Sequence, residues 1–285
     1  MKPSIVIQTD FSLTWSAVAQ MKGVMKRVDP TLDIVDLTHD IKPFDPWAAS
    51  LSLAETEPWW PAGTIFVSVV DAGVGTSRRA SCAKLKDGNT VITPDNGTLT
   101  SLLHSVGIEA VREIDETRNR YAGRETVSVF HGRDIFGYCA ARLAAGVITF
   151  EEVGPVYPIE EIIECPEYSV RPVLSQGCVS GFVMTGVRHF GGISFNITNA
   201  EFESCGFQRG EFMHVTIYNG NRKRFDDRVL YCDTFGDVEI GEPLLYRGSS
   251  GYLSMDLNQG NLMKQYELDT GISWKATIYR EETEK

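Results

Sequence analysis

The spacing of apolar residues changes near residue 170, and this change most constrains the fold of the 285-residue chain. Before it, apolar runs such as "SIVIQTD" and "GTIFVSVVD" alternate with segments of helical spacing, such as residues 17–28. After it, short runs of alternating apolar and polar residues follow one another, among them "EFMHVTIY" and "YLSMDL". We predict an α/β domain with a mostly parallel sheet over residues 1–168. A smaller all-β, barrel-like domain should occupy residues 169–285.

Charge and cysteine content exclude some classes of function. The formal net charge of −11 argues against binding of nucleic acid, which requires a cationic surface. The six cysteines form no CxxC pair, which favours free thiols in a reducing compartment. No run is long enough for a signal peptide or a membrane span. We therefore expect a cytoplasmic protein that contacts neither nucleic acid nor membrane.

Polar side chains follow four predicted strands of the first domain: Asp10, His39–Asp40, Asp71 and His131. Taken singly, each has an ordinary structural explanation, such as a helix cap, a turn or a hydrogen-bonded histidine. Because the carboxyl ends of parallel strands meet at one edge of a sheet, their convergence there indicates a ligand site. Glycines beside Asp71 and His131 allow close approach of the backbone to a ligand. The sequence thus predicts a small-molecule site at this edge.

Two chemistries fit such a cluster. Asp and His are metal ligands, so a metal-dependent hydrolase is one possibility, although no HExxH motif and no closely spaced histidines support it. The other is metal-free: a carboxylate and an imidazole position or deprotonate a nucleophile, while a guanidinium stabilises it. Asp71, Arg78 and His131 supply these groups, and we expect Arg79 to be a surface charge.

Five ordered segments resemble a known family: "TDFSLTWSAVAQMKGVM", "DLTHDIKPFD", "GTIFVSVVDAGVGTSRRA", "PDNGTLTSLL" and "FHGRDIFGYCAARLA". They are similar to the S-adenosyl-L-methionine (SAM) hydroxide adenosyltransferases. These adenosine-forming SAM hydrolases are relatives of the bacterial fluorinase and chlorinase. The resemblance covers the first domain and continues more weakly through "GEPLLYRGSSGYLSMDLNQGNL", which is similar to the family's barrel segment.

The resemblance implies a reaction. Water attacks C5′ of SAM, and L-methionine leaves as a neutral thioether, without metal or cofactor. Asp71, Arg78 and His131 match the family's catalytic set, with Arg78 stabilising a hydroxide-like water that the other two orient or deprotonate. Because the halogenases lack this charged set, the resemblance favours water over halide as the nucleophile. A non-catalytic sensor of adenosine ligands remains an alternative, although it would have no need of the set.

The resemblance also implies substrate contacts and assembly. Asp10 matches an aspartate that binds both ribose hydroxyls. Members of the family form homotrimers, with their sites between subunits. The expected partner is thus a small nucleoside substrate. The other expected substrate-binding residues are Phe44, Phe130 and Gly132 near the ribose and sulfonium, Phe190 and Phe235 around the adenine, and Ser249, Ser250 and Asn258 in a substrate-contacting segment.

Three positions depart from the family pattern. Trp15 and Arg188 stand where carboxylates would meet the ammonium group of methionine, and Gly192 replaces an asparagine expected near the adenine. One explanation is that other carboxylates take over the ammonium; the candidates are Glu201, Glu203 and Asp233. The other is that the substrate is a different 5′-substituted adenosine, with an acidic tail facing Arg188. Trp15 and Arg188 are therefore candidate specificity residues.

Overall fold

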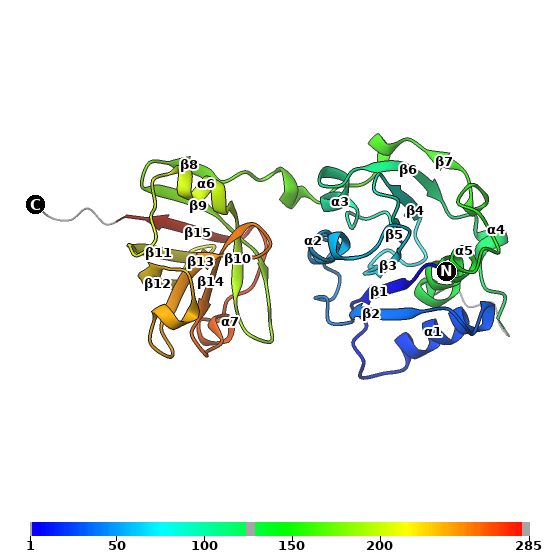
Figure 1. The fold of residues 1–285 in the computed structure, drawn as a ribbon, viewed down its shortest axis with the longest axis horizontal. Coiled ribbons are helices and arrows are strands. Elements are labelled where there is room, and N and C mark those ends of the chain that lie inside the picture. The colour runs from blue at the N-terminus through cyan, green and yellow to red at the C-terminus, as the bar shows by residue number, and fades with distance from the viewer. Residues whose placement is uncertain (1, 124–128, 281–285) are drawn as a thin grey trace, which may run out of the picture. The chain divides into compact units, whose positions relative to one another are not determined.

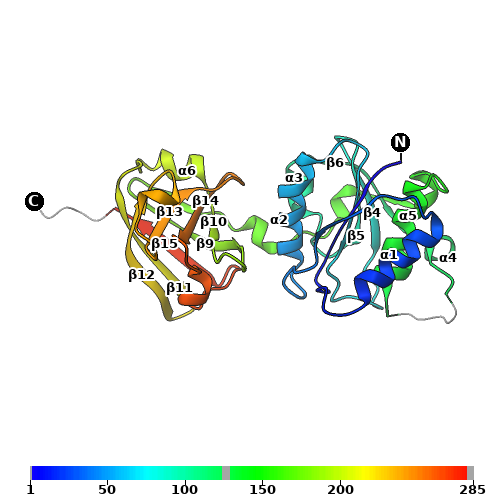
Figure 2. The same ribbon diagram turned by 60° about the horizontal axis from the view of Figure 1, so that its bottom comes forward.

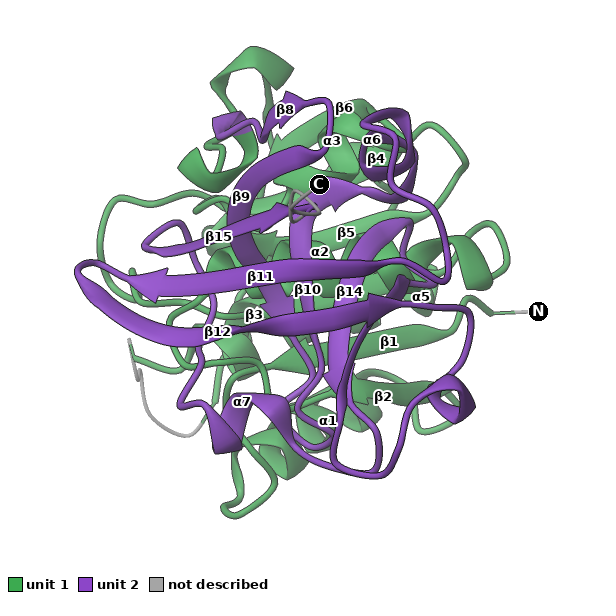
Figure 3. Ribbon diagram, turned by 90° about the vertical axis from the view of Figure 1, so that its left-hand side faces the viewer, with its two compact units in different colours: residues 1–168 green, residues 169–285 purple. Residues whose placement is uncertain are grey.

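The computed structural model describes residues 2–123 and 129–280. The chain divides into two compact units, unit 1 within residues 1–168 and unit 2 within residues 169–285 (Figure 3). Unit 1 is an α/β domain with a mixed, mostly parallel sheet, and unit 2 is an all-β barrel, which confirms the predicted fold classes. Among the described residues, no helix combines the length and apolarity needed to cross a bilayer.

The sheet of unit 1 has seven strands in the order β2-β1-β3-β5-β4-β6-β7 (Figure 1). The first four strands in this order run parallel, whereas β4 is antiparallel to both of its neighbours and β7 is antiparallel to β6. The strands are β1 (Ile5–Thr9), β2 (Ile34–Thr38), β3 (Ile65–Val69), β4 (Ala80–Leu85), β5 (Thr90–Pro94), β6 (Ile108–Glu113) and β7 (Val156–Tyr157). The sequence had suggested neither β4 nor β6.

Helices cover both faces of this sheet (Figure 2). Ile5 and Ile7 of β1 pack with α1 and α5, whereas Val6 between them packs with α2 and α3, as the alternation of side chains along a strand requires. The helices are α1 (Ala17–Val28), α2 (Pro46–Thr56), α3 (Thr100–His104), α4 (Glu116–Asn119) and α5 (Tyr138–Ala144). Short 3-10 turns are η1 (Glu57–Trp59), η3 (Glu151–Val153), η4 (Ile159–Glu161) and η5 (Pro166–Ser169), and η2 (Gly132–Gly137) is a π-helical turn.

Local signals explain the boundaries of α2. The carboxylate of Asp45 accepts a hydrogen bond from the backbone N–H of Ala48 at 2.9 Å, and Pro46 occupies the first helical position, where its fixed φ suits the helix. The strand predicted to end at His131 is wrong in its described part, because Val129 and Phe130 are irregular. Ser128, the first residue of that segment, lies outside the described residues. His131 instead directly precedes η2, which continues into α5.

Unit 2 is a closed barrel of seven strands in the order β10-β14-β13-β12-β11-β15-β9, because β9 also pairs with β10. β8 pairs with β9 outside the barrel, and β12 and β13 run parallel whereas the other neighbouring strands of the barrel are antiparallel. Figure 3 shows β11 and β12 as its long neighbouring strands. The strands are β8 (Val173–Ser175), β9 (Cys178–Gly186), β10 (Ile193–Thr198), β11 (Phe212–Asn219), β12 (Arg222–Tyr231), β13 (Pro243–Arg247), β14 (Tyr252–Leu257) and β15 (Trp274–Tyr279).

Two short helices and a 3-10 turn interrupt the barrel, although the sequence had predicted no helix there. They are α6 (Asn199–Ser204), α7 (Leu262–Gln265) and η6 (Phe235–Asp237). A capping box between Thr198 and Glu201 fixes the start of α6. Helices of one or two turns are too short to show a helical period, so capping residues are the only local sign of them.

Candidate active site

Three neighbouring parallel strands end at one edge of the unit 1 sheet, and polar residues follow each. Asp10 follows β1, His39 follows β2, and Asp71 lies two residues after β3. His39 takes a structural role, because its ring nitrogens contact Thr9 Oγ1 at 2.9 Å and Asp36 Oδ1 at 3.0 Å. Its neighbour Asp40 is exposed. The edge therefore gathers part of the predicted set, with Asp10 after β1 and Asp71 after the neighbouring strand β3.

Asp71, Arg78 and His131 form one hydrogen-bonded cluster. The guanidinium of Arg78 binds Asp71 with two groups: Nε donates to Oδ1 at 2.9 Å, and Nη2 donates to Oδ2. Nη2 also lies 3.0 Å from Nδ1 of His131. The side chains of Asp71 and Arg78 are only 2% and 9% exposed. This bidentate contact fixes the plane of the guanidinium, which a single hydrogen bond would not do.

The glycine-rich turn after β3 gives Arg78 room to reach Asp71. A Cβ at Gly73 would lie 2.8 Å from Cγ of Arg78, so a side chain there would displace the arginine. Gly75 has a φ of +78°, a conformation that favours glycine. Thr76 closes the turn, because its hydroxyl donates to the carbonyl of Gly73 at 2.7 Å. The two glycines thus serve the ion pair.

The contact with Arg78 determines the proton positions on His131. Burial lowers the pKa of His131, and the positive charge of Arg78 lowers it further, so the imidazole is neutral at neutral pH. A guanidinium has no acceptor, so Nδ1 must be the acceptor in this pair and Nε2 must carry the proton. Nη1 of Arg78 has no hydrogen-bond partner within the described residues. The cluster therefore presents free N–H donors from Arg78 and, on the far side of the ring, the N–H of His131.

Asp10 lies at the same edge as Asp71. Burial raises the pKa of Asp10, the N–H of Phe44 opposes this by donating to Oδ2 at 3.0 Å, and the negative charge of Asp71 raises it again. Phe44 has a φ of +63°, unusual for a residue with a side chain, and its ring is exposed. Phe44 thus holds Asp10 through its backbone and leaves its ring unburied.

Aromatic rings lie next to His131. Phe130 packs edge-on against Phe11, with ring centres 5.9 Å apart, and a Cβ at Gly132 would meet the Phe11 ring at 3.2 Å. A side chain at 132 would therefore press against the Phe11 ring and move it by a few tenths of an ångström. Trp15 packs on Phe11 as well, donates from Nε1 to the Phe11 carbonyl at 2.6 Å, and is 59% exposed. The sequence analysis had not singled out Phe11, the ring that joins the other two.

The described residues do not leave Arg188 as an unpaired cation. It is exposed, and its guanidinium lies 3.5 Å from Oδ1 of Asp269. The three carboxylates considered as replacements at the ammonium also have partners within the barrel. Glu201 caps α6, Glu203 binds Arg247 and Tyr231, and Asp233 binds Arg209.

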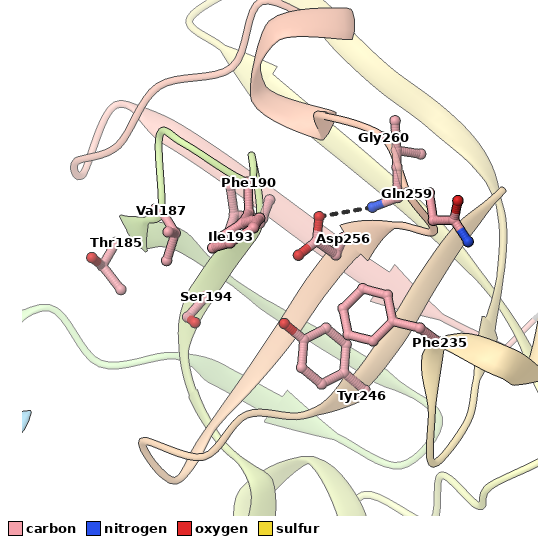
Figure 4. A pocket seen from close by; sticks show the side chains of 13 residues that line it. Thr185, Val187, Phe190, Ile193, Ser194, Phe235, Tyr246, Asp256, Gln259 and Gly260 are labelled. Carbon is pink, nitrogen blue, oxygen red and sulfur yellow. Dashed lines mark hydrogen bonds between the residues drawn. The ribbon is translucent and has the colours of Figure 1, made fainter. Parts of the chain in front are cut away.

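Unit 2 contains a cavity of about 310 Å³ on the outside of the barrel wall (Figure 4). It has aromatic walls and one carboxylic acid. Its lining residues are Thr185, Gly186, Val187, Phe190, Gly192, Ile193, Ser194, Phe235, Tyr246, Asp256, Leu257, Gln259 and Gly260. Phe190 and Phe235, both predicted site residues, are present, whereas the sequence analysis missed Tyr246 and Asp256. An acidic residue within the apolar strand "YLSMDL" was the available signal.

The other predicted residues of unit 2 lie outside this lining set. Ser249 and Ser250 form the turn between β13 and β14. Asn258 is buried, and its side-chain amide donates to the carbonyl of Val238 at 2.8 Å. Substrate contact by these three stays a prediction. Across residues 2–123 and 129–280, no three His, Cys, Asp or Glu side chains are grouped as metal ligands would be.

The fold and the buried cluster define a two-domain protein in which an α/β unit with a charged sheet edge precedes a β-barrel. Comparison with protein families agrees: residues 5–154 match the SAM hydroxide adenosyltransferase N-terminal domain, and residues 187–275 match the C-terminal domain of the same name. The chain belongs to the SAM hydroxide adenosyltransferase family, as the resemblance implied.

Relatives include hydrolases and a halogenase. An (R)-S-adenosyl-L-methionine hydrolase of Salinispora tropica is 34% identical, covering 90% of this chain and 91% of the relative. A fluorinase of Actinopolyspora mzabensis is 28% identical, covering 97% of each chain. A solved structure described as an uncharacterized conserved protein from Thermotoga maritima is 32% identical, with a TM-score of 0.85 over 97% of this chain and 100% of that one.

Proposed function

We propose that this protein hydrolyses SAM to adenosine and L-methionine without a metal. The buried cluster of Asp71, Arg78 and His131 is the observation that carries the proposal. It places a carboxylate and a guanidinium with free N–H donors at the sheet edge where α/β proteins bind ligands. The relatives that are named as SAM hydrolases support the same reaction.

The reaction needs alignment more than acid catalysis. The oxygen of water forms a bond to C5′ while the C5′–S bond breaks, and the sulfur keeps the electron pair as a neutral thioether. The leaving group therefore needs no proton. Water must lie opposite the C–S bond and lose one proton as the new bond forms, so positioning and proton acceptance are the contributions to expect from the protein.

Arg78 and Asp71 contact the water in this proposal. The free N–H groups of Arg78 Nη1 donate to the water oxygen and stabilise it as it becomes hydroxide-like. With its oxygen held, the water donates one hydrogen to a carboxylate, and Asp71 is the nearest one to that guanidinium. The proton then passes from Asp71 to solvent after adenosine forms.

His131 acts through Arg78. Because Nδ1 accepts from Arg78, the ring in this tautomer has no free acceptor for the proton of water. We therefore assign His131 a positioning role: it holds one Nη2 hydrogen while Asp71 holds the other. Asp10 remains the proposed ligand of the ribose hydroxyls, with Phe44, Phe130 and Gly132 beside the ribose and the sulfonium.

The charge at the site favours water over halide. A halide ion needs a neutral or positive pocket, whereas Asp10, Asp71 and Arg78 together place one more acidic than basic group at this sheet edge. Incubation with SAM in the presence of fluoride or chloride tests both reactions. We expect adenosine and methionine in equal amounts by chromatography, unchanged by a chelator. Formation of 5′-haloadenosine, or no turnover, would overturn the proposal.

The assembly is a separate proposal. We propose that the chain forms the homotrimer that its family resemblance implies. Size-exclusion chromatography with light scattering should give three times the chain mass. A monomeric mass with full activity would refute the trimer and leave the hydrolase proposal intact.

A further inference from the structure

The cavity of unit 2 contains a carboxyl group in an unusual place. Along β14, Leu253, Met255 and Leu257 belong to the barrel core, so Asp256 between them points to the outer face. An outward side chain on a small barrel normally meets water, yet Asp256 is only 7% exposed. Figure 4 shows it among Phe190, Phe235 and Tyr246, with its carboxyl turned into the cavity.

Only one oxygen of this carboxyl has a partner. Oδ1 accepts a hydrogen bond from the N–H of Leu257 at 2.9 Å, and Oδ2 has no hydrogen-bond partner among the described residues. Its neighbour across the strands is the buried, apolar Leu244. Within the described part of the chain, the cavity lining includes no charged group other than Asp256. A carboxyl oxygen that faces a largely apolar cavity without a protein partner gains most from a ligand that supplies a donor.

Position 192 is tied to this carboxyl. A Cβ at Gly192 would lie 2.3 Å from Oδ2 of Asp256, so a side chain at 192 and this position of the carboxyl exclude each other. Gly192 stands where the family resemblance led us to expect an asparagine near the adenine. The loss of that amide and the gain of a carboxyl therefore occur in the same space.

We propose that Asp256 is the base-specificity residue of this protein: Oδ2 accepts a hydrogen bond from the exocyclic amine of adenine, replacing the amide missing at 192. The rings of Phe190, Phe235 and Tyr246 suit a flat heteroaromatic base. A 6-oxo purine would place its carbonyl oxygen against Oδ2, which repels it. The inference rests on the proposed function only for the choice of an adenine nucleoside as ligand.

The test measures nucleoside binding and needs no turnover. Isothermal titration of the full-length protein with adenosine and with inosine should show adenosine binding about tenfold or more tightly, as expected for a hydrogen bond to a charged group. Asp256→Asn should abolish this preference, because its amide can donate to the inosine carbonyl. Equal binding of both nucleosides by the wild type, or no binding of adenosine, overturns the inference.

Two further variants keep the test sharp. Gly192→Ala leaves Asp256 in place but pushes its carboxyl aside, so it should reduce the adenosine preference as Asp256→Asn does. Asp227→Asn is the matched control: its exposed carboxylate also accepts from the following N–H, at 2.7 Å, but does not line the cavity. Asp227→Asn should keep the preference. An unchanged preference in both test variants, with thermal unfolding confirming that they fold, refutes the role of Asp256.

Failure of the inference and failure of the proposed function are distinguishable. If SAM is hydrolysed but Asp256→Asn keeps the full preference for adenosine, only the inference falls. If the wild type prefers adenosine in a manner that depends on Asp256 but does not turn over SAM, only the hydrolase proposal falls.

Discussion

Each unit buries a carboxyl group, but the two are compensated differently. Asp71 in unit 1 receives two donors from Arg78, which is itself held by His131. Asp256 in unit 2 receives a single backbone N–H and leaves Oδ2 open to a cavity. A compensated pair keeps its geometry without a ligand, whereas an uncompensated group gains most from one. The comparison suggests that unit 1 is organised in advance for chemistry and unit 2 for recognition.

Removing Arg78, whose guanidinium compensates the charge of Asp71 in unit 1, should have the largest effect on activity. Arg78→Ala should lower kcat/KM for SAM by about 100- to 1,000-fold, because the donors to water are lost. It should also destabilise the fold by about 3 kcal/mol, since Asp71 is left as an unpaired buried charge. Arg78→Lys keeps the charge but cannot contact Asp71 and His131 together, so it should also lose most activity. Steady-state assays with parallel thermal unfolding measure both effects.

The matched control for this prediction is the adjacent arginine. Arg79 pairs with Glu161 and stacks over the ring of Tyr157 at 4.5 Å, away from the cluster contacts. Arg79→Ala should stay within about twofold of the wild-type kcat/KM, because partly exposed ion pairs contribute little. Equal losses in the two alanine variants would mean that the cluster has no special role.

Replacing His131, which positions Arg78 and is neutral at neutral pH, should have a smaller effect on activity. His131→Ala should lower kcat by about 10- to 100-fold with little change in nucleoside binding, and His131→Gln should recover part of the loss, since its side-chain oxygen can accept from Arg78. Protonated His131 would turn a donor toward the guanidinium. Because the pKa of His131 is lowered, activity should persist below the usual histidine range and fall only at more acidic pH. A profile of kcat against pH that is identical in His131→Gln would contradict this role.

The variant of unit 2, Asp256→Asn, should have the smallest effect. It should raise the stability of the fold, whereas Arg78→Ala should lower it. Burial raises the pKa of Asp256 to about 6, so its ionised form opposes folding at pH 8. Asp256→Asn should therefore raise the Tm at pH 8 by about 3 °C. The gain should shrink as pH falls through 6, where the wild type itself takes up the proton. Tyr246, the other titratable group lining the cavity, stays neutral throughout because burial raises its pKa.

Calorimetry of the wild type and of Asp256→Asn, at pH 8 and below pH 6, checks this prediction. Asp227→Asn, with its exposed carboxylate, should show no such gain. A lower Tm for Asp256→Asn at pH 8 would mean that Asp256 already has a partner that stabilises its charge, and the contrast between the units would disappear.

Local sequence was enough for the two fold classes and for the members of the cluster. The change of period near residue 170 separates α/β from all-β because helices and strands bury side chains with different repeats. Asp71 was recognisable because it ends an apolar run, and the spacing of the glycines around it marked a turn. Asp45 and Pro46 marked the start of α2 in the same way.

Tertiary structure alone decided which groups meet and in what state. Arg78 reaches His131 across 53 positions of sequence, and that contact assigns the acceptor nitrogen and the neutral ring. Strand alternation places Asp256 on the outer barrel face, but its burial and its exclusion of a side chain at Gly192 depend on segments that fold over it. Periodicity reports which way a side chain points along its own strand. Which groups that side chain meets depends on segments that are distant in sequence. Its burial and its partners then set its charge state.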